Sequence, residues 1–373
     1  MKKAKQKKKV LVALSGGIDS AVSAYLLIKK GCQVEAAFMK NWSSTTGLKL
    51  QECPWLKDRQ DALRVAAFLK IKIHTLDFEK EYQKTVMQYF FDEYKKGRTP
   101  NPDVMCNKEI KFKLLYNWAM KNGFNFLATG HYTQIKKVAF LHGRAKMQPS
   151  SVPIYRLLRS KDEFKDQTYF IYNVKQEQLP HLLFPIGGMK KKDVRSLARK
   201  IGLPNADRKE SMGLCFVGKI RLKEFLEQKL KPKKGPIINQ DGEKIGEHNG
   251  LYNFTLGQRQ GVNIGGSGPY FVYAKDLKTN KLYVTNFADD DRLKTKEVQI
   301  HSVNWINNTV LSKQYTVLNG RYRHQGELVP LTIKKIKNDL YQVIFRRPQK
   351  AVASGQSLVL YKGKECVGGG VIV

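Results

Sequence analysis

Short apolar runs recur along the first half of the chain, and each is followed by a stretch with helical spacing. Four such runs lie at residues 10–14, 34–39, 71–76 and 126–129. Runs of this length suit strands that are buried on both faces, and strands that alternate with helices form a parallel sheet. We therefore predict an α/β domain in which helices cover both faces of a parallel sheet.

The pattern changes after residue 235, where short alternating runs are separated by Asp-Gly, Asn-Gly and Gly-Gly pairs. These pairs favour tight turns between β-strands, and residues 270–274 and 281–285 are predicted to form a hairpin. A stretch with proline and several lysines at residues 229–235 is typical of a linker. We predict three domains: an α/β domain at residues 1–218, a small central β-rich domain at 219–284, and a C-terminal β-barrel at 285–373.

The first apolar run leads into a Ser-Gly-Gly-Ile-Asp-Ser segment at residues 15–20. Two glycines let the backbone turn sharply and approach an anion, and the first N–H groups of the following helix attract phosphate. A Walker A loop would end in Gly-Lys-Ser/Thr, and this segment has no lysine, so kinase-like phosphoryl transfer is disfavoured. The segment resembles the signature of the PP-loop ATP pyrophosphatases, which split ATP into AMP and pyrophosphate to adenylate a substrate oxygen. An ordinary strand-to-helix turn is the alternative.

Ligands of parallel sheets lie at the carboxyl ends of the strands. Met39 follows the second apolar run and Gly130 follows the fourth, so both are candidates to flank the adenine and ribose of a nucleotide. Packing in the core is the alternative for Met39. The predicted nucleotide-binding residues are Ala13, Leu14, Ser15, Gly16, Gly17, Ile18, Asp19, Ser20, Met39 and Gly130.

The charge balance indicates a polyanionic partner. The 373 residues include 67 Lys and Arg against 32 Asp and Glu, a formal net charge of +35. A field of this sign attracts nucleic acid, although a general lysine bias would also produce it. No apolar run is long enough to cross a membrane, and the basic start is followed by too few apolar residues for a signal peptide. We expect a cytoplasmic protein with no membrane partner.

Two of the five cysteines have a setting that suits chemistry. Cys106 follows a proline-broken loop, at a predicted helix start beside Lys108, where the helix dipole and the ammonium would stabilise a thiolate. Asp103, three residues earlier, is placed to move a proton. Cys215 lies in a glycine-containing loop far along the chain. The spacings form neither a zinc site nor a disulfide framework, so we predict no metal ligands; a buried structural thiol is the alternative for each cysteine.

Several motifs together carry a more specific resemblance. They include Asn101-Pro102-Asp103, the run from Cys106 to Phe112, Lys165-Asp166-Gln167 and Thr255-Leu256-Gly257-Gln258-Arg259, in addition to the glycine loop. This set resembles the bacterial and organellar tRNA-specific 2-thiouridylase family over almost the whole chain. The resemblance implies ATP and Mg²⁺ as cofactors, adenylation of the C2 oxygen of the wobble uridine in the tRNAs for Lys, Glu and Gln, and sulfur transfer from a persulfide.

The resemblance also implies roles for individual residues. Cys215 would hold the persulfide, Cys106 would release its sulfur, and Asp103 would act as acid or base beside the uracil. A persulfide donor protein would load Cys215, and the disulfide left by exchange would be transient. The residues expected at the tRNA, with the barrel contributing the last three, are Asn101, Pro102, Asp103, His131, Lys165, Asp166, Gln167, Arg321, Tyr322 and Gln356.

Two other functions share part of this pattern. A different PP-loop enzyme, such as one that amidates a nucleotide or makes argininosuccinate, would have the glycine loop but no need of Asp103, Cys106 and Cys215. A non-enzymatic RNA-binding protein with a nucleotide-sensing fold would bind tRNA with a steep salt dependence and release no pyrophosphate. Loss of activity when both cysteines are replaced would separate the thiolation hypothesis from either.

Overall fold

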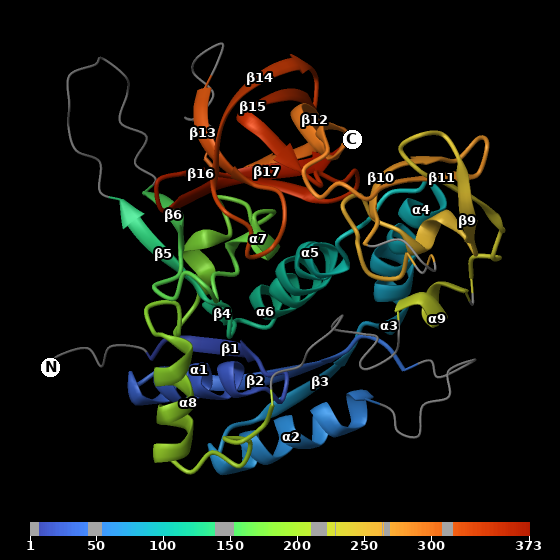
Figure 1. Ribbon diagram of the computed structural model, residues 1–373. Helices are drawn as coiled ribbons and strands as arrows, with labels where there is room; N and C mark the ends of the chain where they lie inside the picture. The colour runs from blue at the N-terminus through green and yellow to red at the C-terminus, as the bar shows by residue number, and fades with distance from the viewer. Residues whose placement is uncertain are drawn as a thin grey trace, which may run out of the picture.

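The computed structural model describes residues 7–43, 54–138, 153–209, 222–227, 229–262, 264, 269–307 and 316–373. Three sheets organise this part of the chain (Figure 1). The parallel sheet lies at the bottom of the view, the barrel at the top, and the small central sheet at the side. In the described part of the chain, no helix combines the length and apolar character that a membrane span requires.

The five-stranded sheet of the α/β half is parallel throughout and has the order β3-β2-β1-β4-β7. Val10 pairs with Val34 on one side and with Phe126 on the other, which confirms the predicted apolar runs as neighbouring strands. The strands are β1 (Lys9–Ala13), β2 (Gln33–Lys40), β3 (Ile73–Asp77), β4 (Phe126–Ala128) and β7 (Leu182–Leu183).

Helices cover both faces of this sheet, as predicted. Phe38 packs with α1 (Ile18–Lys29), α2 (Pro54–Phe68) and α8 (Lys191–Lys200) in one buried cluster. Ala37, the preceding residue of β2, packs in a second cluster on the opposite face, with the end of a long helical run. Successive side chains of a strand point to opposite faces, so both faces of β2 are buried and its sequence is almost continuously apolar.

The helical run on the second face crosses the middle of the molecule (Figure 1). It consists of α5 (Pro102–Met105), a π-helical segment η2 (Cys106–Leu115) and α6 (Tyr116–Lys121). A π-helix of this length is rare, and such segments frequently lie at functional sites. The remaining helical segments are α3 (Glu79–Tyr82), η1 (Gln83–Met87), α4 (Gln88–Lys95), α7 (Thr168–Ile171), η3 (Leu179–His181), α9 (Leu222–Glu227), η4 (Leu251–Asn253) and η5 (Asp291–Leu293).

The central sheet has four strands in the order β10-β11-β8-β9. Antiparallel pairing of β10 with β11, from Phe271 opposite Thr285 to Asp276 opposite Lys281, confirms the predicted hairpin. Val272, Leu282 and Val284 are fully buried in its small core. The strands are β8 (Gly235–Ile238), β9 (Lys244–His248), β10 (Phe271–Asp276) and β11 (Lys281–Thr285).

The C-terminal sheet is a closed barrel of six strands in the order β12-β15-β14-β13-β16-β17, because β17 also pairs with β12. Buried side chains such as Val343, Phe345 and Leu358 fill its interior. The predicted barrel is thus confirmed. Its strands are β12 (Lys294–Trp305), β13 (Thr316–Arg321), β14 (Val329–Lys337), β15 (Leu340–Lys350), β16 (Ser357–Lys362) and β17 (Glu365–Ile372).

A hairpin from the first half of the chain extends the barrel sheet. Strands β5 (Thr133–Val138) and β6 (Ile154–Arg159) pair with each other, and β6 pairs with β17 through Leu158 opposite Glu365. The sequence alone did not predict this hairpin. The predicted domain boundary after residue 218 lies outside the described residues, and the one after residue 284 falls at the end of β11; the three domain ranges stay predictions.

Candidate active site

The glycine loop joins β1 to α1 at the carboxyl edge of the parallel sheet. Gly16 has a φ of +77°, and a Cβ at this position would lie 2.5 Å from the backbone oxygen of Asp58. Only glycine suits this combination of left-handed backbone and close approach. The Ser20 hydroxyl donates to the Gly17 carbonyl at 2.9 Å and accepts from the Ser15 N–H at 3.3 Å, which fixes the loop.

The start of α1 is open to an anion. Gly17 is its N-cap, and among the described side chains none caps the helix. The first-turn N–H groups of a helix have no partner within the helix, and their partial positive charge attracts phosphate. The neighbouring Ala13, Leu14 and Ile18 are buried, and the Leu14 N–H donates to the Ala37 carbonyl at 2.9 Å. Hydrogen bonds and burial therefore fix the conformation of the loop, and no described side chain caps the helix start.

Asp19 of the loop is held by two residues from distant parts of the chain. The Lys191 ammonium lies 2.8 Å from both carboxylate oxygens of Asp19, and the Tyr132 hydroxyl donates to one of them at 2.8 Å. The same ammonium lies 5.6 Å from the centre of the Tyr132 ring. Lys191 and Tyr132 were not among the predicted site residues. The lysine run at 190–192 and the position of Tyr132 after the fourth strand were the available signals.

A second group of side chains supports the loop from the other side. The Gly16 carbonyl accepts from the Asn205 amide at 2.7 Å and from the Arg208 guanidinium at 3.2 Å. Arg208 also pairs with Asp58 and with Asp61 of α2. These contacts tie the glycine loop to α2 and to the chain segment that leads towards residue 210. Neither Asn205 nor Arg208 was predicted from the sequence.

Met39 and Gly130, the predicted flanking residues, both lie at the carboxyl edge of the sheet. Met39 is half-buried between two apolar clusters. Gly130 contacts the start of α1, since a Cβ there would lie 2.7 Å from the Ser20 nitrogen and 2.8 Å from the Asp19 carbonyl carbon. Gly130 therefore allows β4 to approach the glycine loop closely.

The Asn101-Pro102-Asp103 motif forms the first turn of α5. Asn101 is its N-cap and accepts the Val104 N–H at 3.2 Å, while Pro102 occupies the first turn, where its missing N–H costs nothing. Asp103 is half-buried in the same turn. Cys106 lies one turn further, where η2 begins, and only 2 % of its surface is exposed.

The environment of Cys106 is apolar. It belongs to a buried cluster with Tyr82, Phe90 and Phe225. The expectation that Cys106 stands at the helix start beside Lys108 needs adjustment, because the helix begins four residues earlier and Lys108 is exposed. Cys215, the second predicted catalytic cysteine, lies outside the described residues.

The Lys165-Asp166-Gln167 motif meets the barrel. Asp166 is buried and accepts from the Ser160 N–H at 3.0 Å and from the Arg321 guanidinium at 3.0 Å. The Gln167 side chain accepts the Tyr132 N–H at 2.9 Å, and Lys165 is half-buried. The structure thus brings together two predicted tRNA contacts, Asp166 and Arg321, as a buried ion pair between the two halves of the chain.

His131 is buried next to the glycine-loop edge. Its Nδ1 lies 2.7 Å from the Thr129 hydroxyl, and its ring packs 5.8 Å from that of Phe112. Burial, and to a lesser extent the charge of Lys111, lowers the pKa of His131 well below its usual range. The buried setting therefore favours the neutral imidazole of His131.

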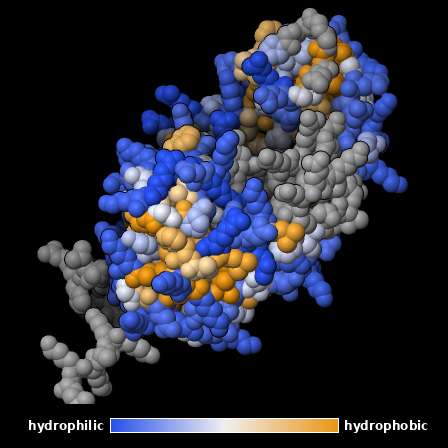
Figure 2. Space-filling view, turned by 90° about the horizontal axis from the view of Figure 1, so that it is seen from below, coloured by the Kyte–Doolittle hydropathy of each residue, from blue (hydrophilic) through white to orange (hydrophobic). Residues whose placement is uncertain are grey.

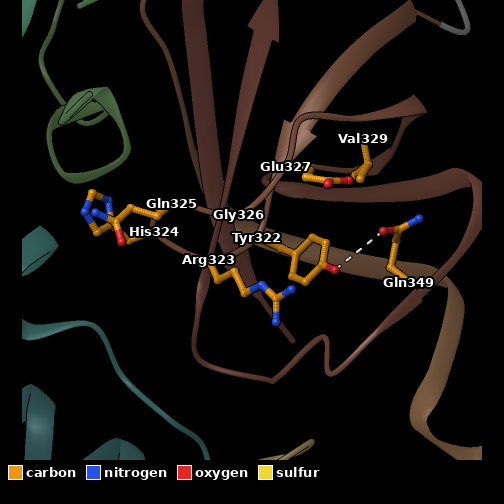
Figure 3. A pocket seen from close by; sticks show the side chains of 8 residues that line it. All are labelled: Tyr322, Arg323, His324, Gln325, Gly326, Glu327, Val329 and Gln349. Atoms are coloured by element: carbon orange, nitrogen blue, oxygen red, sulfur yellow. Dashed lines mark hydrogen bonds between the residues drawn. The ribbon is translucent and has the colours of Figure 1, made fainter. Parts of the chain in front are cut away.

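The barrel presents a pocket of about 330 Å³ in the turn between β13 and β14. Its lining residues are Tyr322, Arg323, His324, Gln325, Gly326, Glu327, Val329 and Gln349 (Figure 3). The Tyr322 hydroxyl points towards Gln349 and lies 3.5 Å from its side-chain oxygen. Gln356 points elsewhere: its amide donates to the Thr99 and Pro100 carbonyls at 2.8 and 3.3 Å, beside the Asn101 motif.

Family models match nearly the whole chain in three successive pieces. They are described as a tRNA methyl transferase HUP domain at residues 8–219, a tRNA methyl transferase PRC-barrel domain at 223–286 and an aminomethyltransferase β-barrel domain at 295–372. The tRNA-specific 2-thiouridylase MnmA of Buchnera aphidicola subsp. Schizaphis graminum is 41% identical over 374 residues, which cover 99% of this chain and 98% of the relative. The chain belongs to the tRNA-specific 2-thiouridylase family.

Membership in the 2-thiouridylase family rests on more than one relative. The MnmA protein of Bacillus licheniformis is also 41% identical, over 100% of this chain and 96% of its own length. Two of the family-model descriptions refer to tRNA methyl transfer, whereas these full-length relatives are named thiouridylases. The relatives determine the family assignment because each match covers at least 99% of this chain. The predicted family and enzyme class are confirmed.

Solved structures show more distant likenesses. A 4-thiouridine synthetase in complex with RNA and ATP matches 59% of this chain and 50% of its own, with 18% identity and a TM-score of 0.36. The NMN synthetase of Francisella tularensis matches 55% of this chain and 66% of its own, with 18% identity and a TM-score of 0.32. Likenesses at this level carry no argument about substrate.

Proposed function

We propose that this enzyme uses ATP to convert the wobble uridine of the tRNAs for Lys, Glu and Gln to 2-thiouridine. The full-length relation to tRNA-specific 2-thiouridylases carries the proposal. The arrangement of the site supports it, because the glycine loop follows β1 at the carboxyl edge of the parallel sheet, and Cys106 belongs to a buried cluster against which Met39, near the carboxyl end of β2, packs. A tRNA substrate also accounts for the net charge of +35.

The glycine loop fits the phosphates of ATP. The uncapped start of α1, the left-handed backbone at Gly16 and the hydroxyls of Ser15 and Ser20 provide donors without side-chain bulk. Bound ATP supplies the adenylyl group that turns the uracil C2 oxygen into a good leaving group. Mg²⁺ would enter with the phosphates, since this ion is held in nucleotide sites by phosphate oxygens and one or two carboxylates. Asp19 is the carboxylate within the loop.

Asp103 and Cys106 would act on the base and the sulfur. Asp103, half-buried in the first turn of α5, takes or returns a proton at the uracil. The terminal sulfur of a persulfide on Cys215 attacks C2, and AMP leaves. The Cys106 thiolate then attacks the Cys215 sulfur, so that the S–S bond of the persulfide breaks, sulfur stays on the base and a Cys106–Cys215 disulfide forms. A dithiol reductant restores both thiols.

The tRNA would lie across the α/β half and the barrel. Asn101, Pro102 and Asp103 meet the target base, and Lys165 and Tyr322 contribute from the two sides of the interface. Gln167 and His131 lie next to Tyr132, which belongs to the segment that follows β4 of the parallel sheet. Asp166, Arg321 and Gln356 are engaged by protein groups, so we assign their effect on tRNA to the loops that they hold. A persulfide donor protein loads Cys215, and a cytoplasmic setting suits both partners.

Mass analysis of nucleosides tests the proposal. Unmodified tRNA for Lys is incubated with the protein, ATP, Mg²⁺ and a persulfide donor, in parallel with Cys106→Ser and Cys215→Ser. We expect 2-thiouridine that requires ATP and both cysteines, whereas Cys32→Ser, at the far end of α1 from the glycine loop, retains activity. Pyrophosphate release that both cysteine variants retain, with no 2-thiouridine in any sample, would favour a different PP-loop enzyme. Binding of tRNA without pyrophosphate release would favour a non-enzymatic RNA-binding protein.

A further inference from the structure

The loop at residues 97–101 leads directly into α5, which carries Asp103 and Cys106. It follows α4 and is anchored there by Arg98, which pairs with Glu93. Both the central sheet and the barrel form hydrogen bonds with this loop. The segment that precedes the proposed catalytic residues is therefore in contact with both of these sheets.

The central sheet grips the loop through β10 and the segment before it. The Lys275 ammonium donates to the Gly97 carbonyl and, at 2.9 Å, to the Phe254 carbonyl. The Thr255 hydroxyl lies 3.1 Å from that of Thr99. Gly97 has a φ of +70°, and a Cβ there would lie 2.9 Å from the side chain of Leu277, so the sheet packs tightly on the loop.

The barrel grips the same residues from its segment before β16. The Thr99 N–H donates to the Ser354 carbonyl at 2.9 Å, and the Gln356 amide donates to the Thr99 and Pro100 carbonyls. A Cβ on Gly355 would lie 3.0 Å from atoms of Arg98 and Thr99. The loop thus connects the two sheets. Its Gly97 carbonyl is bonded to the central sheet, and the backbone groups of Thr99 and Pro100 are bonded to the barrel.

We propose that Lys275 is a positioning residue of the enzyme, whose ammonium fixes the Gly97 carbonyl and thereby holds Asp103 and Cys106 in their working position. Burial lowers the pKa of Lys275 to about 8, so this lysine lies in an environment that disfavours its charge. In the described part of the chain no carboxylate lies within 4 Å of its Nζ atom to offset that cost. The ammonium of Lys275 instead satisfies the carbonyls of Gly97 and Phe254, and a buried carbonyl that lacks a hydrogen-bond donor destabilises the folded protein. This inference rests on the proposed function.

The test compares Lys275→Met with Lys278→Met, an exposed lysine beyond the end of the same strand. Methionine matches the length of the side chain but has no donor. We expect hydrogen–deuterium exchange of the amides at residues 97–106 to rise about tenfold in Lys275→Met, with single-turnover thiolation falling by a similar factor. Affinities for ATP and tRNA stay within about twofold, and Lys278→Met behaves like the wild type.

The conservative variant and a second contact keep the test decisive. Lys275→Arg retains hydrogen-bond donors, so its residues 97–106 are expected to be as protected from exchange as in the wild type. If Lys275→Met does not fold, Thr255→Val removes the neighbouring contact with Thr99 and is expected to give the same local increase in exchange. Wild-type exchange and rate in Lys275→Met, or an equal rise in exchange over the whole chain, would overturn the inference. A wild type that makes no 2-thiouridine would reject the proposed function instead, and the exchange comparison would still decide whether Lys275 holds the loop.

Discussion

The guanidinium of Arg321 lies 3.0 Å from the carboxylate of Asp166, and only 6% and 0% of these two side chains are exposed. Arg321 ends the barrel strand β13, whereas Asp166 precedes α7 of the α/β half. Asp166 also accepts the Thr168 hydroxyl at 2.8 Å. The pair therefore fixes the barrel relative to the loop that carries Lys165, and both surfaces are needed for the proposed tRNA site.

Breaking this pair should destabilise the protein. Arg321→Met removes the 3.0 Å ion pair of the buried Asp166 carboxylate and leaves Arg159 at 3.9 Å, so we expect a loss of about 3 kcal/mol in the free energy of unfolding, the lower end for a broken buried pair. Urea unfolding of the barrel, followed by tryptophan fluorescence, measures the change. Arg323→Met, an exposed neighbour in the same turn, is the control and should change stability by less than about 0.5 kcal/mol. Equal stability of the two variants would contradict the role given to the pair.

Gly130→Ala should weaken both folding and ATP binding. The added Cβ would lie 2.7 Å from the Ser20 nitrogen, a backbone atom that cannot move without shifting the start of α1. We expect a loss of about 1–3 kcal/mol in stability, together with a higher Kd for ATP. Thermal unfolding and calorimetric titration with ATP measure the two effects. The matched control is Gly188→Ala, where a Cβ meets no atom within 4 Å.

Lys191→Met tests the contact of the lysine with Asp19 at the glycine loop. The ammonium is 2.8 Å from both carboxylate oxygens, so its loss removes the contact that orients Asp19 beside the proposed phosphate site. We expect the Kd for ATP to rise about tenfold, which corresponds to about 1.4 kcal/mol. Binding of a fluorescent ATP analogue measures this change, with the exposed neighbour Lys192→Met as control. An unchanged Kd would show that Lys191 serves only the fold.

His131 should make stability depend on pH in the acid range. Its pKa is lowered in the folded state, so below about pH 6.5 the unfolded chain binds a proton that the folded protein does not. Stability from this group is complete above that pH and falls as the pH drops, by at most about 1.4 kcal/mol per pH unit. His131→Asn should flatten the decline in denaturation midpoint between about pH 6.5 and 5 relative to the wild type. Parallel pH profiles for His131→Asn and the wild type would contradict this role.

The sequence predicts the elements whose signals are local. Continuous apolar runs predict the parallel strands because helices cover both faces of that sheet. The two adjacent glycines predict the conformation of the glycine loop because Gly16 adopts a positive φ. The partners of these elements were not predictable in the same way. Lys191 reaches Asp19 and Arg208 reaches Gly16 only after the chain has folded, and nothing in a lysine run or a single arginine specifies such a distant acceptor.

The distribution of polar and apolar side chains over the surface does not mark the site either. Hydrophilic side chains cover most of the face seen from below, with apolar side chains gathered in smaller areas (Figure 2). The net charge of +35 predicts a nucleic-acid partner, but Lys191 and Arg321, two basic residues of the candidate site, are largely buried and paired with carboxylates. Arg321 was predicted as a contact with RNA, and its burial against Asp166 could not be anticipated from composition.

The pairing of β17 with both β12 and β6 has a consequence for how the protein is made. The edge of the hairpin formed by β5 and β6 is covered by Glu365 and Cys366 of β17, which follow β6 much later in the chain. During synthesis the first half of the chain therefore leaves the ribosome with an uncovered β-edge, which is a site for wrong pairing between chains. Because β17 both closes the barrel and pairs with β6, deletion of Glu365–Ile372 should disrupt the barrel and uncover the hairpin at once.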